Sequence, residues 1–152
     1  MYKYKFEKIL KIKSDLEEQI KQVYAFHVQK KAALLNENEA MQNNYYENKA
    51  DYLETLKPGD KISVAELQSA EDYGLAVQIR IKNNLNMVSK LDVEIEKLAK
   101  KLQKATAERK MFEKLKEKDY AQYREELSQR EDRDLDEIAN YKYYETHIKE
   151  AK

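Results

Sequence analysis

The chain contains no cysteine, one proline and two glycines among its 152 residues. Because tight turns depend on Gly, Pro, Asn and Asp at restricted backbone angles, a fold with many turns is excluded. Without cysteine there is no disulfide, no thiolate metal site and no cysteine nucleophile. The sequence therefore excludes β-sandwiches, barrels and doubly wound sheets, and it favours long helices.

Long apolar runs are also missing. No run approaches the ~18 consecutive apolar residues of a membrane-spanning helix. The first six residues lack the apolar segment of a signal peptide. We therefore expect no direct membrane insertion, and the absence of cysteine is compatible with a reducing cytoplasm. Charged residues make up 38 % of the chain, but the formal net charge is zero, so the whole chain does not resemble a general binder of polyanions.

The sequence has one clear helix break. Pro58 forces the residue before it out of helical geometry, and Gly59 supplies the backbone freedom for a reversal. Ser63 and Glu66 then have the spacing of a capping box, in which each side chain accepts the other residue's backbone N–H. The predicted organisation is a single domain over 1–152, with helix one at about 3–56, a turn at 57–62 and helix two at about 63–146.

Apolar residues in the second helix recur at alternating steps of three and four. Eleven of these fourteen positions are apolar, which is the pattern of a left-handed coiled coil. After Phe112 the apolar positions shift to Leu115 and Tyr120, as a stutter would produce. The fourteen positions are Leu67, Ala70, Gly74, Val77, Ile81, Asn84, Val88, Leu91, Ile95, Leu98, Leu102, Ala105, Arg109 and Phe112.

The first helix has a weaker pattern, with polar residues in its middle. A short turn between long amphipathic helices favours antiparallel neighbours. With the reversal centred on Gly59, Leu16 lies opposite Leu102 and Met41 opposite Val77. The predicted fold is all-α, an antiparallel two-helix coiled-coil hairpin whose second helix is longer than the first. The predicted seam of helix one consists of Ile9, Leu16, Ile20, Val23, His27, Lys30, Leu34, Met41, Tyr45 and Tyr52.

In this register, roughly 30 residues at the end of helix two have no partner within the chain. Because an isolated helix draws most of its stability from packing, this overhang implies a partner. Charge is also segregated. Residues 34–72 carry nine acidic and three basic side chains, residues 97–118 carry nine basic and three acidic, and residues 119–139 carry eight acidic against three arginines. The blocks are either solvated faces or surfaces matched to separate partners.

Candidate chemistry is sparse. His27 and His147 are the only histidines, and they lie near opposite ends of the chain. The chain has no phosphate-binding GxxxxGK[ST] motif, and a two-helix stalk offers no concave site. The basic block at 97–118 holds a single aromatic residue, Phe112, on the seam, so a stacking platform for single-stranded nucleic acid is missing. We expect no catalysis, cofactor, metal, small-molecule substrate or nucleic acid.

Tyrosine is unusually frequent, with twelve residues. The overhang carries five of them, which either fill the seam or make protein contacts, since tyrosine gives a large contact area at low entropic cost. The five are Tyr120, Tyr123, Tyr141, Tyr143 and Tyr144.

Four segments have a recognisable order and spacing: Tyr4–Leu10, Gly59–Leu67 followed by Tyr73, Lys110–Lys118 followed by Tyr123, and Leu135–Ala139. Together they resemble the FliJ family, the small coiled-coil component of the bacterial flagellar type III export apparatus. The resemblance covers nearly the whole chain. It implies a stalk that enters the pore of the hexameric export ATPase and promotes its activity, at the cytoplasmic face of the cell membrane at the flagellar base.

The resemblance also implies contacts with the cytoplasmic domain of the export gate protein and with export chaperones. In the family the gate contact lies at the start of the second helix, where Tyr73, Val77, Arg80 and Asn84 stand here. Arg80 and Asn84 depart from the small and imidazole side chains expected there. Tyr73 flanks Gly74, whose missing side chain predicts a shallow notch that a partner could fill.

The ATPase contact in the family uses the end at which the chain termini meet. The matching candidates here are basic residues of the 97–118 block and apolar residues of the overhang. Two other classes stay open, a general cytoplasmic coiled-coil adaptor and the equivalent stalk of a virulence type III secretion system. The ATPase-binding candidates are Lys110, Lys114, Lys118, Tyr123, Leu127, Leu135 and Ile138.

Overall fold

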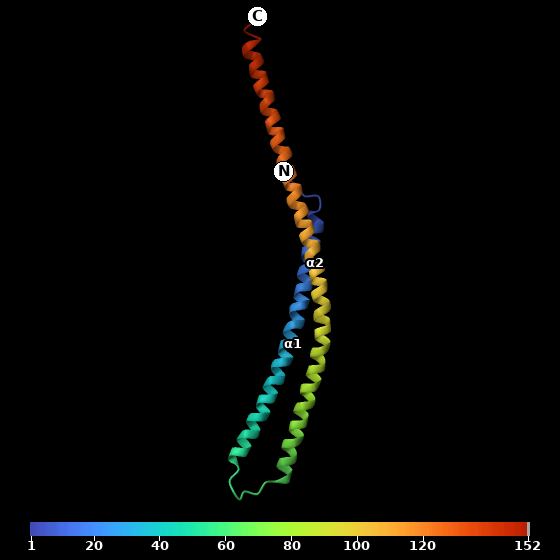
Figure 1. Ribbon diagram of the computed structural model, residues 1–152, viewed down its shortest axis with the longest axis vertical. Coiled ribbons are helices and arrows are strands. Elements are labelled where there is room, and N and C mark those ends of the chain that lie inside the picture. The colour runs from blue at the N-terminus through green and yellow to red at the C-terminus, as the bar shows by residue number, and fades with distance from the viewer. Residues whose placement is uncertain (152) are drawn as a thin grey trace. The chain divides into compact units, whose positions relative to one another are not determined.

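The protein is a pair of long helices joined by a short connection (Figure 1). The computed structural model describes residues 1–151, and these contain α1 (Glu7–Thr55) and α2 (Val64–His147). The chain is 88 % helical, and the described residues contain no strand. The helices pack against each other as an antiparallel hairpin with α2 the longer, which confirms the predicted fold class.

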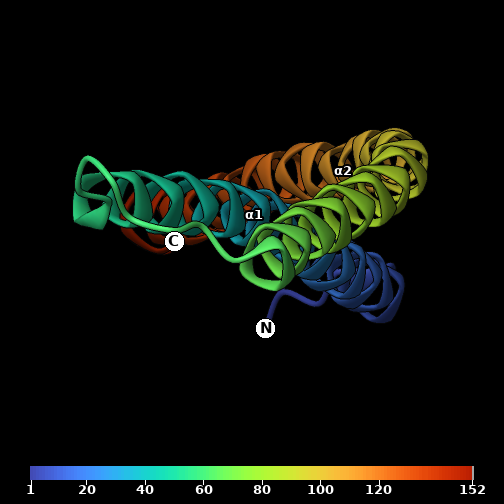
Figure 2. The same ribbon diagram turned by 90° about the horizontal axis from the view of Figure 1, so that it is seen from below.

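The connection reverses the chain where proline and glycine predicted it. Gly59 has a φ of 91°, a conformation that side-chain-bearing residues rarely adopt. The Asp60 N–H donates to the Lys57 carbonyl at 3.0 Å, and the Asp60 carboxylate accepts the Lys57 N–H at 2.7 Å. These contacts, with Pro58 before the glycine, are those of a type II turn. Figure 2 shows the connection passing from one helix end to the other.

The chain divides into two compact units. Unit 1 comprises Met1–Glu17 and Lys104–Lys152, and unit 2 comprises Glu18–Gln103. Each unit therefore contains a part of α1 and a part of α2, and each is described here by itself. The prediction that residues 1–152 form a single domain stays a prediction.

The seam of α2 follows the predicted heptad pattern over most of its length. Every predicted position from Gly74 to Phe112 is buried or half-buried. Leu67 and Ala70, which were predicted to continue the seam, are exposed instead, because the two helices separate toward the connection (Figure 1). The predicted shift after Phe112 is also wrong. Leu115 is exposed and Lys116 is half-buried, so the original phase continues to Lys116.

The seam of α1 was predicted correctly at some positions and displaced by one residue at others. Ile9, Leu16, Val23 and Lys30 are exposed, and the residues that follow Leu16, Val23 and Lys30 face α2 instead. The displacement arises because charged residues occupy the seam, where an apolar pattern was expected. The buried and half-buried positions from residue 13 onward are Lys13, Glu17, Ile20, Tyr24, His27, Lys31, Leu34, Glu37, Asn38, Met41, Tyr45 and Tyr52.

The register of the helices agrees with the predicted one at some contacts, such as Tyr45 on Gly74 and Glu37 with Arg80, and differs from it at others. In unit 1 Lys13 contacts Glu108, and in unit 2 Asn38 contacts Asn84. Each pair is displaced by about one helical turn from the predicted alignment. The prediction assumed a symmetric turn at Gly59, and it could not account for the ion pairs and amide contacts that fix the register.

Neither helix within residues 1–151 combines the length and the apolar content needed to cross a membrane.

Candidate protein interfaces

An ion-pair cluster joins the two helices in unit 1. The buried Glu17 carboxylate accepts a hydrogen bond from Arg109 Nε, and Arg109 Nη1 donates to Glu113 at 2.6 Å. These two carboxylates raise the pKa of Arg109, chiefly through the hydrogen bond to Glu17. Lys13 Nζ lies 2.8 Å from Glu108, and that hydrogen bond lowers the pKa of the Glu108 carboxyl. The cluster fixes which part of α1 faces which part of α2.

The N-terminal segment extends this contact beyond the start of α1. Tyr4 is buried, and its hydroxyl donates to the Phe112 carbonyl at 3.0 Å. The Tyr2 hydroxyl donates to Asp119 at 2.9 Å, and its ring lies 5.0 Å from that of Tyr120 and 5.2 Å from that of Tyr123, between centroids. Burial and then the Asp119 contact raise the pKa of Tyr2 to about 12. Residues 1–6 thus cover α2 as far as Tyr123.

The α2 segment after Tyr123 is an exposed surface of unit 1. Every residue from 124 to 151 is exposed, and Leu135 retains 64 % of its accessible surface. We call residues 124–147 the overhang. Leu127 and Ile138 lie on it with Leu135, so three of the predicted ATPase-binding residues are unpartnered apolar side chains. Tyr123 differs, because it is half-buried against Tyr2.

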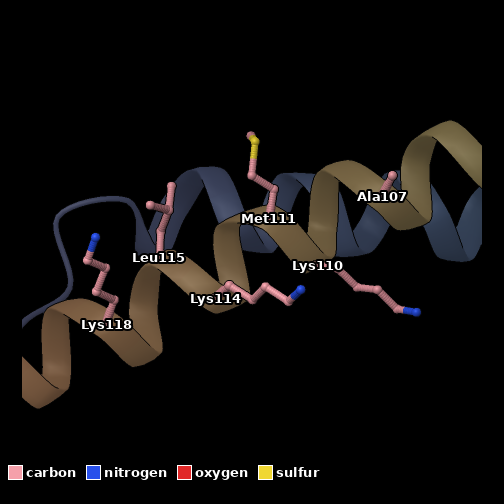
Figure 3. Close-up of a pocket in the computed structure, with 6 residues that line it drawn as sticks. All are labelled: Ala107, Lys110, Met111, Lys114, Leu115 and Lys118. Carbon is pink, nitrogen blue, oxygen red and sulfur yellow. The ribbon is translucent and has the colours of Figure 1, made fainter.

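The three predicted lysines are exposed residues of α2 that lie outside the seam. Lys110, Lys114 and Lys118 line a shallow pocket with Ala107, Met111 and Leu115 (Figure 3). Within the described residues, none of the three lysines has a carboxylate at ion-pair distance. In contrast, Lys116 lies on the seam and is paired with Glu7 at 2.8 Å. The pocket is therefore a basic surface with an apolar centre.

A polar network occupies the seam in unit 2. Asn84 is buried, and its amide donates to Asn38 at 2.8 Å and to Glu37 at 3.3 Å. Arg80 reaches the same Glu37 carboxylate at 2.6 Å. Val77 is also buried. Two of the four predicted gate-binding residues, Val77 and Asn84, therefore face α1, and a third, Arg80, is exposed but paired.

Tyr73 is a predicted gate-binding residue that is exposed and, unlike Arg80, is not held in an ion pair. Its side chain is exposed, and its ring lies 6.3 Å from that of Tyr45, between centroids. The expected notch at Gly74 is not vacant, because the Tyr45 ring fills it. A Cβ built on Gly74 would lie 3.0 Å from that ring. The prediction of a notch for a partner side chain is therefore wrong, and Gly74 instead allows close packing of the chain's own helices.

The described residues contain no group of three or more His, Asp or Glu side chains placed to hold a metal ion. The candidate residues fall in two sets by unit: all seven ATPase-binding candidates belong to unit 1, and all four gate-binding candidates belong to unit 2.

The fold and these surfaces define a helical hairpin coiled coil whose longer helix ends in an unpartnered amphipathic segment. A family model described as Flagellar FliJ protein matches residues 2–147, which is nearly the whole chain. The chain therefore belongs to the FliJ family, and it is a coiled-coil component of the flagellar export apparatus. Neither a curated protein nor a solved structure matches it.

Proposed function

We propose that the chain is the central stalk of the hexameric flagellar export ATPase, which it enters through the overhang and whose activity it promotes. The observation that supports this most directly is the overhang itself. It presents Leu127, Leu135 and Ile138 to solvent on a helix with no second helix beside it in unit 1. An amphipathic helix of this length is stabilised chiefly by packing, so a partner surface is required.

The charges of unit 1 fit the same proposal. The three unpaired lysines Lys110, Lys114 and Lys118 precede an acidic segment, residues 119–139, in which eight acidic side chains face three arginines. Two blocks of opposite sign on one helix can fix the depth of insertion, because each block must meet a complementary surface on the ATPase. In this proposal the apolar residues supply affinity and the charged blocks supply orientation.

A second contact, with the cytoplasmic domain of the export gate protein, is proposed for the start of α2. Tyr73 and Arg80 carry it, since their side chains are exposed. Val77 and Asn84 act from the seam by holding this part of α2 against α1. The chain thereby links the ATPase to the gate and to export chaperones in the cytoplasm, at the inner face of the membrane, and has no enzymatic activity of its own.

The test is stimulation of ATP hydrolysis by the full-length chain. The triple variant Leu127→Ser, Leu135→Ser, Ile138→Ser removes the apolar stripe of the overhang. We expect it to lose stimulation while its helicity, measured by circular dichroism, is retained. A matched control, Leu75→Ser, Ile79→Ser, Val93→Ser, changes three equally exposed apolar residues of unit 2 and should stimulate normally. Normal stimulation by the overhang variant contradicts the proposal.

The gate contact is tested separately. Tyr73→Ala should weaken binding to the purified cytoplasmic domain of the gate protein in titration calorimetry, and it should leave ATPase stimulation unchanged. Tyr46→Ala is the control, because Tyr46 is another exposed tyrosine of unit 2, on α1. Unchanged gate binding by the Tyr73 variant would remove the start of α2 from the proposal.

A further inference from the structure

Unit 1 exposes apolar side chains that neither the seam nor the overhang uses. On α2, Met111 keeps 51 % and Leu115 keeps 42 % of its accessible surface. In Figure 3 both side chains leave the helix on the same side, whereas Lys110 and Lys114 point away from it. On α1, Ile12 keeps 63 % of its accessible surface. These residues are long aliphatic side chains, of the kind that normally faces the seam.

The exposed residues of the two helices belong to one flank of the hairpin. Positions a whole number of heptads apart lie on the same flank of a coiled-coil helix. On α1, Ile9 and Leu16 lie beside Lys13 on one flank, four residues before it and three after it, and on α2 Leu115 lies one heptad after Glu108. Because Lys13 and Glu108 form an ion pair across the two helices within unit 1, these flanks lie on one side. We call the resulting surface the lateral face, and it consists of Ile9, Ile12, Leu16, Met111 and Leu115.

The spacing on the lateral face is that of a binding surface for a helix. Ile9, Ile12 and Leu16 are separated by three and four residues, and Met111 and Leu115 by four, so each helix presents one side of a shared apolar stripe. A third helix laid along such a stripe buries its own apolar positions at the same spacing. Methionine at the centre suits this role, because its flexible side chain adapts to the partner's shape.

The charged residues beside the lateral face indicate which kind of partner would bind it. Lys110, Lys114 and Lys118 adjoin Met111 and Leu115 on the pocket surface, and none of these lysines is paired within the described residues. An acidic partner would supply carboxylates that pair with lysines of this surface. A lipid surface fits less well, because the same helix continues into the acidic segment 119–139, which an anionic membrane would repel.

We propose that the lateral face binds an acidic amphipathic helix of a partner protein, packed alongside α1 and α2 in unit 1. The apolar residues of that helix contact Ile12, Leu16, Met111 and Leu115, and its carboxylates pair with Lys118, which leaves α2 on the same side as Met111 and Leu115 (Figure 3). The apolar residues of this surface are separate from those of the overhang, whereas the lysines beside it also belong to the basic block of the proposed ATPase contact.

The test uses the full-length chain and a synthetic helical peptide with leucine at the a and d positions and glutamate at the flanking positions. Binding is measured by fluorescence anisotropy of the labelled peptide. Ile12→Ser with Leu115→Ser should raise the Kd by about tenfold or more, as expected for loss of central contacts. The control Val93→Ser with Leu85→Ser changes exposed apolar residues of unit 2 and should leave the Kd unchanged. Rising salt should weaken binding.

Two peptide controls test the chemistry, one with lysine in place of glutamate and one with serine in place of leucine, and neither should bind. No saturable binding of the acidic peptide, or equal binding by the Ile12/Leu115 variant, overturns the proposal. Two other results would also overturn it. If anionic lipid vesicles capture the parent chain but not the Ile12/Leu115 variant, the occupant is a membrane. If the parent chain self-associates in sedimentation and the variant does not, the occupant is a second copy of the chain. The overhang triple variant should bind the peptide normally, which separates this outcome from failure of the stalk proposal.

Discussion

At the scale of single residues, polar side chains in the seam decide how the helices align. Glu17 and Arg109 in unit 1, and Asn38 and Asn84 in unit 2, occupy positions that apolar residues fill in a simple coiled coil. A polar residue at such a position costs stability, but it disfavours registers in which it would lose its partner. We infer that these pairs fix the register at which the two helices meet.

The asparagine pair gives the clearest test of this role. Asn84→Ala should destabilise the chain by about 1–3 kcal/mol, because the buried Asn38 amide loses its partner. Replacing both asparagines by leucine should be neutral or stabilising, since no buried polar group is then left unpaired. Urea unfolding followed by circular dichroism measures both. A single variant as stable as the parent would show that the amide contact contributes nothing.

The Glu108 carboxyl predicts how stability depends on pH. The Lys13 hydrogen bond lowers its pKa below the ordinary value of 4.5, so the unfolded chain takes up this proton at a higher pH than the folded chain. The stabilisation is therefore present above pH 4.5 and is lost as pH falls through the folded-state pKa. In urea unfolding from pH 7 downward, the stability difference between the parent and Glu108→Gln should shrink below pH 4.5. A difference that is constant with pH contradicts this account.

At the scale of the helices, the sequence predicted α2 better than α1. The heptads of α2 are mostly apolar, so their phase could be read directly, and the positions from Gly74 to Phe112 do face α1. In α1 the seam contains Lys13, Glu17 and Lys31, whose partners lie on the other helix. Such pairing depends on the register, which the pattern of one helix does not reveal. The sequence pattern therefore predicts the exposed apolar residues beside them as the seam.

The corrected phase of α1 can be tested with two neighbouring aliphatic residues. Leu16 is exposed and Ile20 is half-buried in the seam. Leu16→Ala should change the free energy of unfolding by no more than about 0.5 kcal/mol. Ile20→Ala should cost roughly 1–3 kcal/mol, less than a fully buried position, because the side chain is partly covered. The phase predicted from the sequence places both residues in the seam, so it would be the better one if Leu16→Ala cost as much as Ile20→Ala in thermal or urea unfolding.

The candidate interfaces could be predicted from the sequence less well than the fold, because their exposure depends on contacts between the helices. The family resemblance placed Val77 and Asn84 at the gate contact, but only the packed hairpin shows that both are buried. Tyr123 was expected on the overhang, and it is instead covered by Tyr2 from a segment that precedes α1. Leu127, Leu135 and Ile138 were placed on an unpartnered stripe from the excess length of helix two, and they are exposed.

At the scale of the whole molecule, exposed apolar residues occur in both units of the chain. The overhang and the lateral face belong to unit 1, and the exposed Tyr73 belongs to unit 2. A protein without a deep pocket that has several such surfaces is suited to join other proteins. In the two proposals, the ATPase uses the overhang, the gate protein uses the start of α2 and an acidic helix uses the lateral face of one chain.

The central claim is that the overhang is the part that contacts the hexameric export ATPase. Site-specific photo-crosslinking tests it most directly, with a crosslinking residue placed in turn at Leu127 and Ile138, and at Ile79 in unit 2 as a control. All three positions are exposed, so their chemistry toward a partner is comparable. The account predicts crosslinks to the ATPase from the two overhang positions and none from Ile79. Crosslinks from Ile79 alone would contradict it and would assign the ATPase contact to unit 2.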